Sequence, residues 1–206
     1  MRIVRVETLL SRGPYPKSRH WKRTRKTIHE AASRCCWPPG SGSFTIYSES
    51  GKNRGERNGV LPIKREFVEH LRDKGWAIEG KAKSAMGRCV RHFDAVIAGP
   101  DGPIVVEWKT GNISSSHLSM NKMSLLLSSG LIAAGTMVVP SRELYKHLAD
   151  RAGSIPELEP YFPIWNSIPC ENGLLEILVI EHDRTSYDVP KIPRLISGRA
   201  RGWPST

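Results

Sequence analysis

The sequence predicts an α/β fold in which a mixed central β-sheet is flanked by helices. Short aliphatic and β-branched runs alternate with helical segments along the chain, as is typical of layered α/β domains. Two of these β-rich runs are joined by Gly99-Pro-Asp-Gly102, a tight-turn sequence that predicts one antiparallel strand pair. With 206 residues, 39% of them apolar, the chain suits a single domain spanning residues 1–206 with a full hydrophobic core.

Proline and glycine mark the elements of the N-terminal half. The expected elements are a helix over about residues 17–36, a strand over 43–47, a helix over about 62–74 and a strand beginning over 76–79. The first helix ends because Trp37-Pro-Pro-Gly40 cannot continue it. Pro62 suits the first position of the second helix, and Gly75 is expected to cap its end.

The C-terminal half continues the alternation. The expected elements are strands over 89–98 and 104–109, a helix over about 114–129, a strand over 131–139, a helix over about 141–149 and a last strand over 174–181. One of the serines 114–116, and Ser141, are expected as N-caps, because a serine hydroxyl accepts a hydrogen bond from first-turn amides. A proline-punctuated loop through Trp165 precedes the last strand.

The net charge of +11 is concentrated at the two ends of the chain. Residues 1–26 carry a net +8 and residues 191–206 a net +4, whereas the body between them is close to neutral at −1. Lysine and arginine displace the counterions condensed on nucleic-acid phosphates, so both ends suit contact with DNA. Flexible, solvated basic tails are the alternative, and charge alone does not choose between the two.

Cysteine usage and hydropathy exclude several classes of protein. The four cysteines, Cys35, Cys36, Cys89 and Cys170, form no CxxC pair, which favours reduced structural thiols over a zinc site or a disulfide framework. No apolar stretch is long enough to cross a bilayer, and the N-terminus lacks the apolar core of a secretory signal. A cytoplasmic protein without a membrane partner is therefore expected.

The turn at residues 99–102 brings two carboxylates together. In a two-residue loop, Gly99 pairs with Gly102, and the register places Asp94 directly opposite Glu107, with Cβ atoms roughly 5 Å apart on one sheet face. Lys109 lies two residues beyond Glu107 and shares that face. A three-residue loop with a bulge would shift the register by one, so the facing pair depends on the turn type.

Opposed carboxylates repel unless a cation lies between them, and a divalent metal with oxygen ligands is the usual one. Asp94 and Glu107 would hold Mg²⁺, while Lys109 would stabilise charge on a scissile phosphate, which is the PD-(D/E)xK arrangement of nucleases. A surface hairpin with a cross-strand ion pair is the alternative. The metal site is favoured because the charges of Glu107 and Lys109 interrupt an apolar run, where burial is costly unless they are paired or metal-bound.

Longer strings extend this pattern over most of the chain. They are Phe44-Thr-Ile46, Asn58-Gly-Val-Leu-Pro-Ile-Lys64, Glu107-Trp-Lys-Thr-Gly-Asn-Ile-Ser-Ser-Ser-His117, Ser119-Met-Asn-Lys122, Asp150-Arg151 and Glu157-Leu-Glu-Pro-Tyr-Phe162. Collinear over about residues 37–193, they resemble the BamHI family of type II restriction endonucleases. The resemblance implies a restriction-endonuclease-like core and a homodimer that cuts both strands of double-stranded DNA at a short palindromic site with Mg²⁺.

The resemblance also implies roles for individual residues. Asp94, Glu107 and the backbone carbonyl of Trp108 match metal ligands, and Glu79 matches a further active-site acid that would otherwise be a solvated strand end. The residues that match DNA-contacting positions are Asn112, Ser114, Asp150 and Arg151 for bases, and Lys64 and Lys122 for phosphates. Arginine can bind guanine, aspartate can accept from cytosine and asparagine can pair with adenine, which fits base readout. The alternative is a helix cap for Asn112 and Ser114 and a solvated helix end for Asp150 and Arg151. For the two lysines it is plain solvent exposure.

Three positions depart from the family. Lys109 stands where BamHI has glutamate, although lysine is usual in the wider superfamily, so the identity of the general base is open. Leu118 replaces a base-reading arginine, and near Ser197 no aspartate stands where the family has one for base readout. The recognition sequence is therefore open, and a site that keeps a GATC core is one interpretation.

Other functions remain in competition with a restriction enzyme. A structure-specific PD-(D/E)xK repair or junction nuclease would cut according to DNA structure, and a DNA-binding protein that has lost catalysis would leave duplex intact with Mg²⁺. The complete acid-acid-lysine set argues against the second, and a neutral α/β domain with basic tails does not account for the collinear strings. The apolar helix over residues 115–129 is expected to pack on the sheet and, by resemblance, against a second subunit.

Overall fold

The structure, a computed structural model, describes residues 1–48, 57–83, 89–110, 113–148 and 153–193. Its strands are β1 Arg2–Arg12, β2 Thr45–Tyr47, β3 Ala77–Lys83, β4 Cys89–Ile97, β5 Ile104–Trp108, β6 Ala134–Pro140, β7 Gly173–Glu181 and β8 Arg184–Ser186. Its helices are η1 Tyr15–Lys17, α1 Arg19–Arg34, α2 Leu61–Asp73, α3 Ile113–Ser128, α4 Arg142–Tyr145, α5 Ile155–Leu158, η2 Glu159–Tyr161 and α6 Phe162–Asn166, where η1 and η2 are single 3₁₀ turns.

Six strands form one mixed sheet in the order β1-β7-β6-β5-β4-β3. The central strands β5, β6 and β7 are parallel, whereas β1, β4 and β3 run antiparallel to their neighbours. β2 and β8 form a separate two-stranded parallel sheet. The predicted α/β fold with a mixed central sheet is confirmed.

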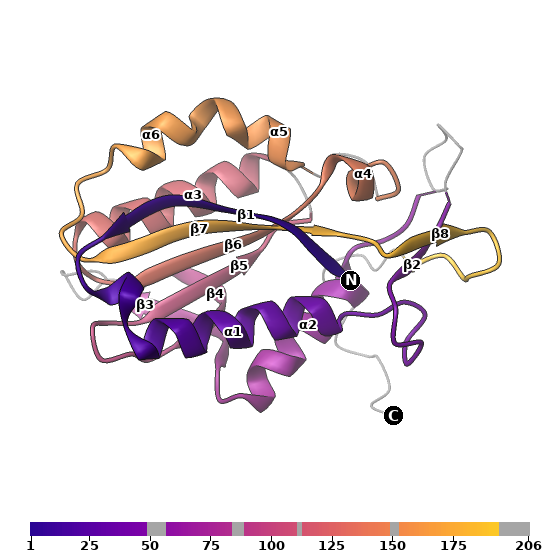
Figure 1. Cartoon of the computed structure of the whole chain (residues 1–206), viewed down its shortest axis with the longest axis horizontal. Helices are drawn as coiled ribbons and strands as arrows, with labels where there is room; N and C mark the ends of the chain where they lie inside the picture. Colours follow the sequence, from indigo (N-terminus) through magenta and orange to yellow (C-terminus); the bar gives the residue numbers. More distant parts are fainter. Residues whose placement is uncertain (49–56, 84–88, 111–112, 149–152, 194–206) are drawn as a thin grey trace.

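Helices cover both faces of the sheet (Figure 1). α1 and α2 lie on one face and contribute Ile28 and Phe67 to one hydrophobic core, while α3 and α6 lie on the other and contribute Met123 and Trp165 to a second. Because successive strand residues point to opposite faces, β5 supplies both cores in turn and is buried along its whole length. Glu107 therefore lies on a strand that is packed on both faces.

Local turn and cap chemistry agrees with the sequence at three points. The amide of Gly102 donates to the carbonyl of Gly99 at 3.2 Å, as expected of the two-residue loop. Gly75 adopts a left-handed φ of +84° just past α2, a conformation that glycine reaches without strain. The Ser141 hydroxyl accepts a hydrogen bond from the amide of Leu144 at 3.0 Å and caps α4.

Several predicted boundaries are wrong. α3 begins at Ile113, so the serines 114–116 lie in its first turn instead of capping it. α4 ends at Tyr145, and the predicted proline-rich loop contains the short helices α5, η2 and α6, each with a proline in its first turn. A proline in the first turn of a helix costs no helical hydrogen bond. The prolines in this segment therefore mark the starts of short helices and do not exclude helices.

The basic N-terminal segment contains a strand that was not predicted. β1 pairs antiparallel with β7, from Arg2 opposite Glu181 to Arg12 opposite Gly173, so residues 2–12 form an edge of the central sheet. Its charged residues hide the apolar alternation, and charged side chains on an edge strand protect its unpaired backbone groups. This part of the segment is therefore built into the sheet, while most of the basic C-terminal tail lies outside the described residues.

Three of the four cysteines have a described side chain. Cys35, Cys36 and Cys170 are free thiols, and burial raises the pKa of the Cys35 thiol strongly, which makes it unreactive. In the described ranges, no helix combines the length and apolarity needed to cross a membrane.

Candidate active site

The β4–β5 hairpin sets the position of the two principal acids. Its ladder pairs Ala95 with Val106 and continues to Ile97 with Ile104, which is the register of a two-residue loop. The paired residues end at Ala95 and Val106, one residue short of Asp94 and Glu107. The backbone amide of Trp108 donates to Asp94 Oδ2 at 2.8 Å, which ties the Asp94 carboxylate to β5 beside Glu107. The predicted register is confirmed.

Glu79 continues this row onto the third strand. The β3–β4 ladder pairs Ile78 with Ala95 and Gly80 with Phe93, so Glu79 falls opposite Asp94. The ladder is interrupted there, because Glu79 has a φ of 53°. A left-handed conformation costs a non-glycine residue about 1–3 kcal/mol, and such strain is concentrated at functional sites. The exposed side chain of Glu79 and the two other acids thus come from three adjacent strands at one position along the sheet.

Glu107 is buried between two lysines. Its carboxylate is 3% exposed, and its oxygens lie 3.0 Å from Lys109 Nζ and 2.8 Å from Lys122 Nζ. A buried charge is strongly destabilising unless it is paired, so this double pairing offsets the cost of burying the Glu107 carboxylate. Lys109 comes from the segment directly after β5, whereas Lys122 comes from α3 on the covering layer.

Asp94 is paired separately, from the other side of the sheet. Lys64, in the first turns of α2, places its Nζ 2.6 Å from Asp94 Oδ1. Lys64 and Lys122 were expected at DNA phosphates, and the structure instead places both ammonium groups on the candidate metal acids. Sequence spacing did not show this, because the two lysines lie 30 and 15 residues from the acids that they bind.

The donor chemistry of this site suits a hard divalent cation. Asp94, Glu107 and the nearby Trp108 carbonyl offer only oxygen ligands, which Mg²⁺ prefers. The ammonium groups of Lys64, Lys109 and Lys122 already supply the positive charge that two adjacent carboxylates require. Over the part of the chain that the structure describes, no three His, Cys, Asp or Glu side chains converge on a common point, so Glu79 does not join the other two acids.

The expected base-contacting residues are only partly described. Ser114 is exposed in the first turn of α3, and Leu118, in place of the family's arginine, is 49% exposed on the same helix. Asn112, Asp150, Arg151 and Ser197 lie outside the described residues.

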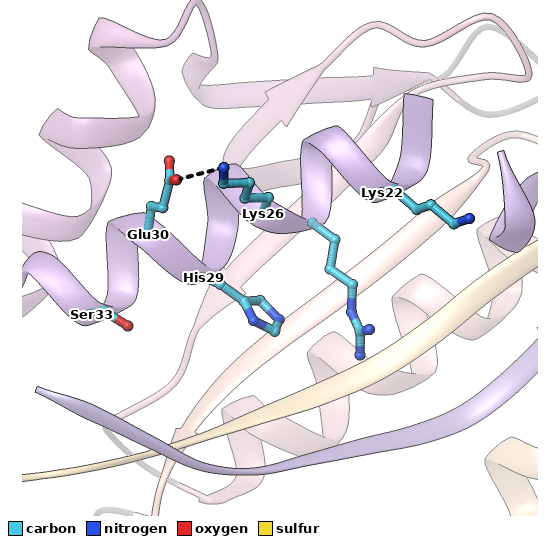
Figure 2. Close-up of a pocket in the computed structure, with 6 residues that line it drawn as sticks. Lys22, Lys26, His29, Glu30 and Ser33 are labelled. Atoms are coloured by element: carbon cyan, nitrogen blue, oxygen red, sulfur yellow. Dashed lines mark ion pairs between the residues drawn. The ribbon is translucent and has the colours of Figure 1, made fainter. Parts of the chain in front are cut away.

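A separate cavity of about 420 Å³ follows the outer side of α1 (Figure 2). The residues that line it are Lys22, Arg25, Lys26, His29, Glu30 and Ser33. Arg25 also reaches into the fold, where its Nη2 lies 2.9 Å from the fully buried Glu176 carboxylate. Burial raises the pKa of Glu176, and the pairing with Arg25 only partly offsets this. None of the candidate catalytic residues lines this cavity, so it is distinct from the acid site.

Comparison with known proteins bears on the whole chain. The family model "Restriction endonuclease BamHI" matches residues 1–199. The chain is 37% identical over 200 residues to the type II restriction enzyme OkrAI of Oceanobacter kriegii, covering 97% of this chain and 99% of OkrAI. It is 31% identical over 192 residues to the type II restriction enzyme BamHI of Bacillus amyloliquefaciens, covering 87% of this chain and 85% of BamHI.

A solved structure shares the fold at low sequence identity. The crystal structure of the restriction endonuclease BglII complexed with a DNA 16-mer matches with a TM-score of 0.64 and 9% identity, covering 89% of this chain and 79% of that chain. The predicted restriction-endonuclease-like core is therefore confirmed. Together with the full-length family match, the fold shows that this chain belongs to the BamHI family of type II restriction endonucleases.

Proposed function

We propose that this restriction endonuclease is a single domain over residues 1–206 that hydrolyses both strands of double-stranded DNA at a short palindromic site, with Mg²⁺ as cofactor. The observation that carries the proposal is the 2.8 Å hydrogen bond from the Trp108 amide to the Asp94 carboxylate, next to Glu107, whose carboxylate lies 3.0 Å from Lys109 Nζ. A hydrolase that acts on intracellular DNA would work in the cytoplasm.

The proposed chemistry divides between the acids and the lysine. Asp94, Glu107 and the Trp108 carbonyl would hold Mg²⁺, with Glu79 nearby. When bound, the metal would activate a water molecule and stabilise charge on the phosphoryl oxygens. Lys109 is 19% exposed and its Nζ lies beside Glu107, so its ammonium can reach a phosphate placed next to that carboxylate. As a protonated amine it acts in this scheme as an electrostatic stabiliser of the scissile phosphate.

Residues near the start of α3 would contact the DNA bases. We assign base contacts to Asn112, Ser114, Asp150 and Arg151, and phosphate contacts to Lys64 and Lys122, whose ammonium groups lie beside the candidate metal acids. The basic N-terminal and C-terminal segments would add phosphate contacts that carry no sequence information. The altered readers at Leu118 and Ser197 suggest a recognition site different from that of BamHI, and a GATC core remains the favoured hypothesis.

A homodimer is supported by one exposed apolar surface. Leu118 and Leu125 on α3 and Tyr161 and Ile164 on η2 and α6 are 44–61% exposed. The ring centroids of His117 and Tyr161 lie 4.4 Å apart, so α3 and η2 pack together and these exposed side chains lie on neighbouring elements. Exposed apolar clusters of this kind mark interaction sites, and a twofold dimer matches a palindromic DNA site.

The deciding experiment is digestion of a plasmid of known sequence by the purified protein with Mg²⁺, against an EDTA control, followed by run-off sequencing of the ends. Discrete, Mg²⁺-dependent fragments with identical ends are expected, and the ends give both the recognition sequence and the cut position. Cuts that follow DNA structure would point to a repair-type nuclease. Intact plasmid with duplex binding would point to a DNA-binding protein without catalysis.

A further inference from the structure

Two adjacent residues of α3 make polar contacts in different directions. Asn121 Oδ1 accepts a hydrogen bond from the indole Nε1 of Trp165 on α6 at 2.9 Å, whereas Lys122 Nζ lies 2.8 Å from Glu107 Oε1. Successive helical residues point about 100° apart, because there are 3.6 residues per turn. α3 therefore links α6, on the outer layer, directly to a candidate metal ligand in the sheet.

The Lys122 side chain is held much more firmly than a surface ion pair. It is 9% exposed, its Nζ also donates to the carbonyl of His92 at 3.0 Å, and the same ammonium lies 3.6 Å from the centre of the Phe93 ring. These partners come from both β4 and β5. An ammonium group with three donors is thus saturated by two oxygens and an aromatic face. Such a contact restricts the Glu107 carboxylate to one orientation relative to β4.

Lys109 does not have the same effect on Glu107. It follows Glu107 by two residues in the same segment and is more exposed, at 19% against 9% for Lys122. A shift of α3 would leave the contact between Lys109 and Glu107 intact, whereas it would pull directly on the contact made by Lys122. Only Lys122 can therefore transmit the position of the covering helices to the acid.

We propose that Lys122 is a positioning residue that orients Glu107 for metal binding, and that Asn121 and Trp165 couple this orientation to the packing of α3 on α6. The inference rests on the proposed function, since it assumes that Glu107 is a metal ligand. The proposed dimer face, which is the exposed surface on α3 and α6, would then be coupled to the metal site through Lys122. Docking of a second subunit on that face would then strengthen metal binding.

Whether replacing Lys122 weakens or tightens metal binding distinguishes a lysine that orients Glu107 from one that only neutralises its charge. If Lys122 were only a counterion, Lys122→Met would remove a competing cation and tighten metal binding. If it orients Glu107, the variant weakens binding, as happens when partners that orient a metal ligand are removed, by about 10-fold or more. Lys109→Met is the comparison variant, because it removes the other ammonium and leaves the contact between α3 and Glu107.

The test is isothermal titration of the full-length protein with Mn²⁺ and with Mg²⁺, without DNA. We expect Lys122→Met to bind about 10-fold more weakly than the unaltered protein and Lys109→Met to bind as well or better. Trp165→Phe, which keeps a smaller aromatic side chain but loses the indole donor to Asn121, should weaken binding a few-fold. Trp37→Phe is its matched control, since it loses an indole hydrogen bond of 2.7 Å to Pro190 away from α3.

Each outcome bears on the inference. Unchanged or tighter binding by Lys122→Met would overturn positioning, and unchanged binding by Trp165→Phe, which keeps a smaller aromatic side chain, would overturn coupling through α6 even if Lys122→Met failed to fold. Failure of the unaltered protein to bind either metal would refute the proposed metal site itself. In cleavage assays, a positioning defect should raise the Mg²⁺ concentration needed for half-maximal rate.

Discussion

Replacing Glu107 by glutamine removes one negative charge from between two buried ammonium groups. The glutamine carbonyl can still accept from one lysine, but its NH₂ group then faces the other ammonium with no acceptor to offer. Lys109 and Lys122, which lie 3.0 and 2.8 Å from the carboxylate, would keep their charges and lose their shared counterion. We therefore expect Glu107→Gln to destabilise the metal-free protein.

The burial of the three side chains sets the size of the effect. Breaking a buried ion pair by removing one partner costs about 3–5 kcal/mol. Lys109 is 19% exposed and recovers part of its hydration, so the lower end, about 3 kcal/mol, is the better expectation. For a chain of 206 residues, 1 kcal/mol shifts the melting temperature by about 2–4 °C, which gives a decrease of about 6–12 °C.

The assay is thermal unfolding followed by circular dichroism in EDTA at low salt. Glu143→Gln is the matched control, because Glu143 pairs with Lys146 at 2.7 Å on the exposed surface, and its loss should leave the melting temperature unchanged. Added Mg²⁺ should stabilise the unaltered protein by mass action and should stabilise Glu107→Gln much less.

The direction of the change is decisive. Active-site acids that repel one another commonly destabilise a fold, so removing one of them usually stabilises the protein. If Glu107→Gln melted at or above the temperature of the unaltered protein, the carboxylate would not be the shared counterion of Lys109 and Lys122. The account of how this site tolerates its charges without metal would then be wrong.

Three further predictions concern chemistry, pH and assembly. Asp94→Asn should reduce Mg²⁺-dependent cleavage about 1000-fold, because several kcal/mol of charge stabilisation are lost. Duplex binding in EDTA, measured by gel shift, should persist or tighten. Normal cleavage by this variant would refute the assignment of Asp94 as a metal ligand. Burial lowers the pKa values of His29 and His182 below the ordinary 6.5, so the stability that these histidines contribute is present above pH 6.5 and is lost as the pH falls below it. The melting temperature should therefore drop between pH 7.5 and 5.5, and it should drop less steeply in His182→Gln. Equal slopes for the two proteins would contradict this. Leu125→Asp should convert the proposed dimer to monomer in analytical ultracentrifugation, whereas Val4→Asp, at an exposed position on β1, should not. If Leu125→Asp sedimented like the unaltered protein, the apolar surface around Leu125 would be excluded as the dimer interface.

The sequence by itself determined the parts of the site that depend on near neighbours. The turn Gly99-Pro-Asp-Gly102 is short and chemically specific, so it sets the β4–β5 register observed between residues 95–97 and 104–106, next to Asp94 and Glu107. Ser141 and Gly75 likewise mark helix ends through contacts within a few residues. The fold class followed from the alternation of apolar runs, because burial on two faces imposes that pattern locally.

Which residues far apart in the sequence come into contact depends on tertiary packing and could not be predicted from the sequence. β1 pairs with a strand about 170 residues away, and its charged edge gave no clear alternation to detect. Lys64 and Lys122 contact the acids because α2 and α3 dock on opposite faces of the sheet, a geometry that spacing along the chain does not contain. The left-handed turn at Glu79 is imposed by ladder pairing on both sides of it. Local chemistry sets turns and registers, whereas the neutralisation of buried charge depends on how the elements pack, because it requires side chains from separate layers to meet within about 3 Å.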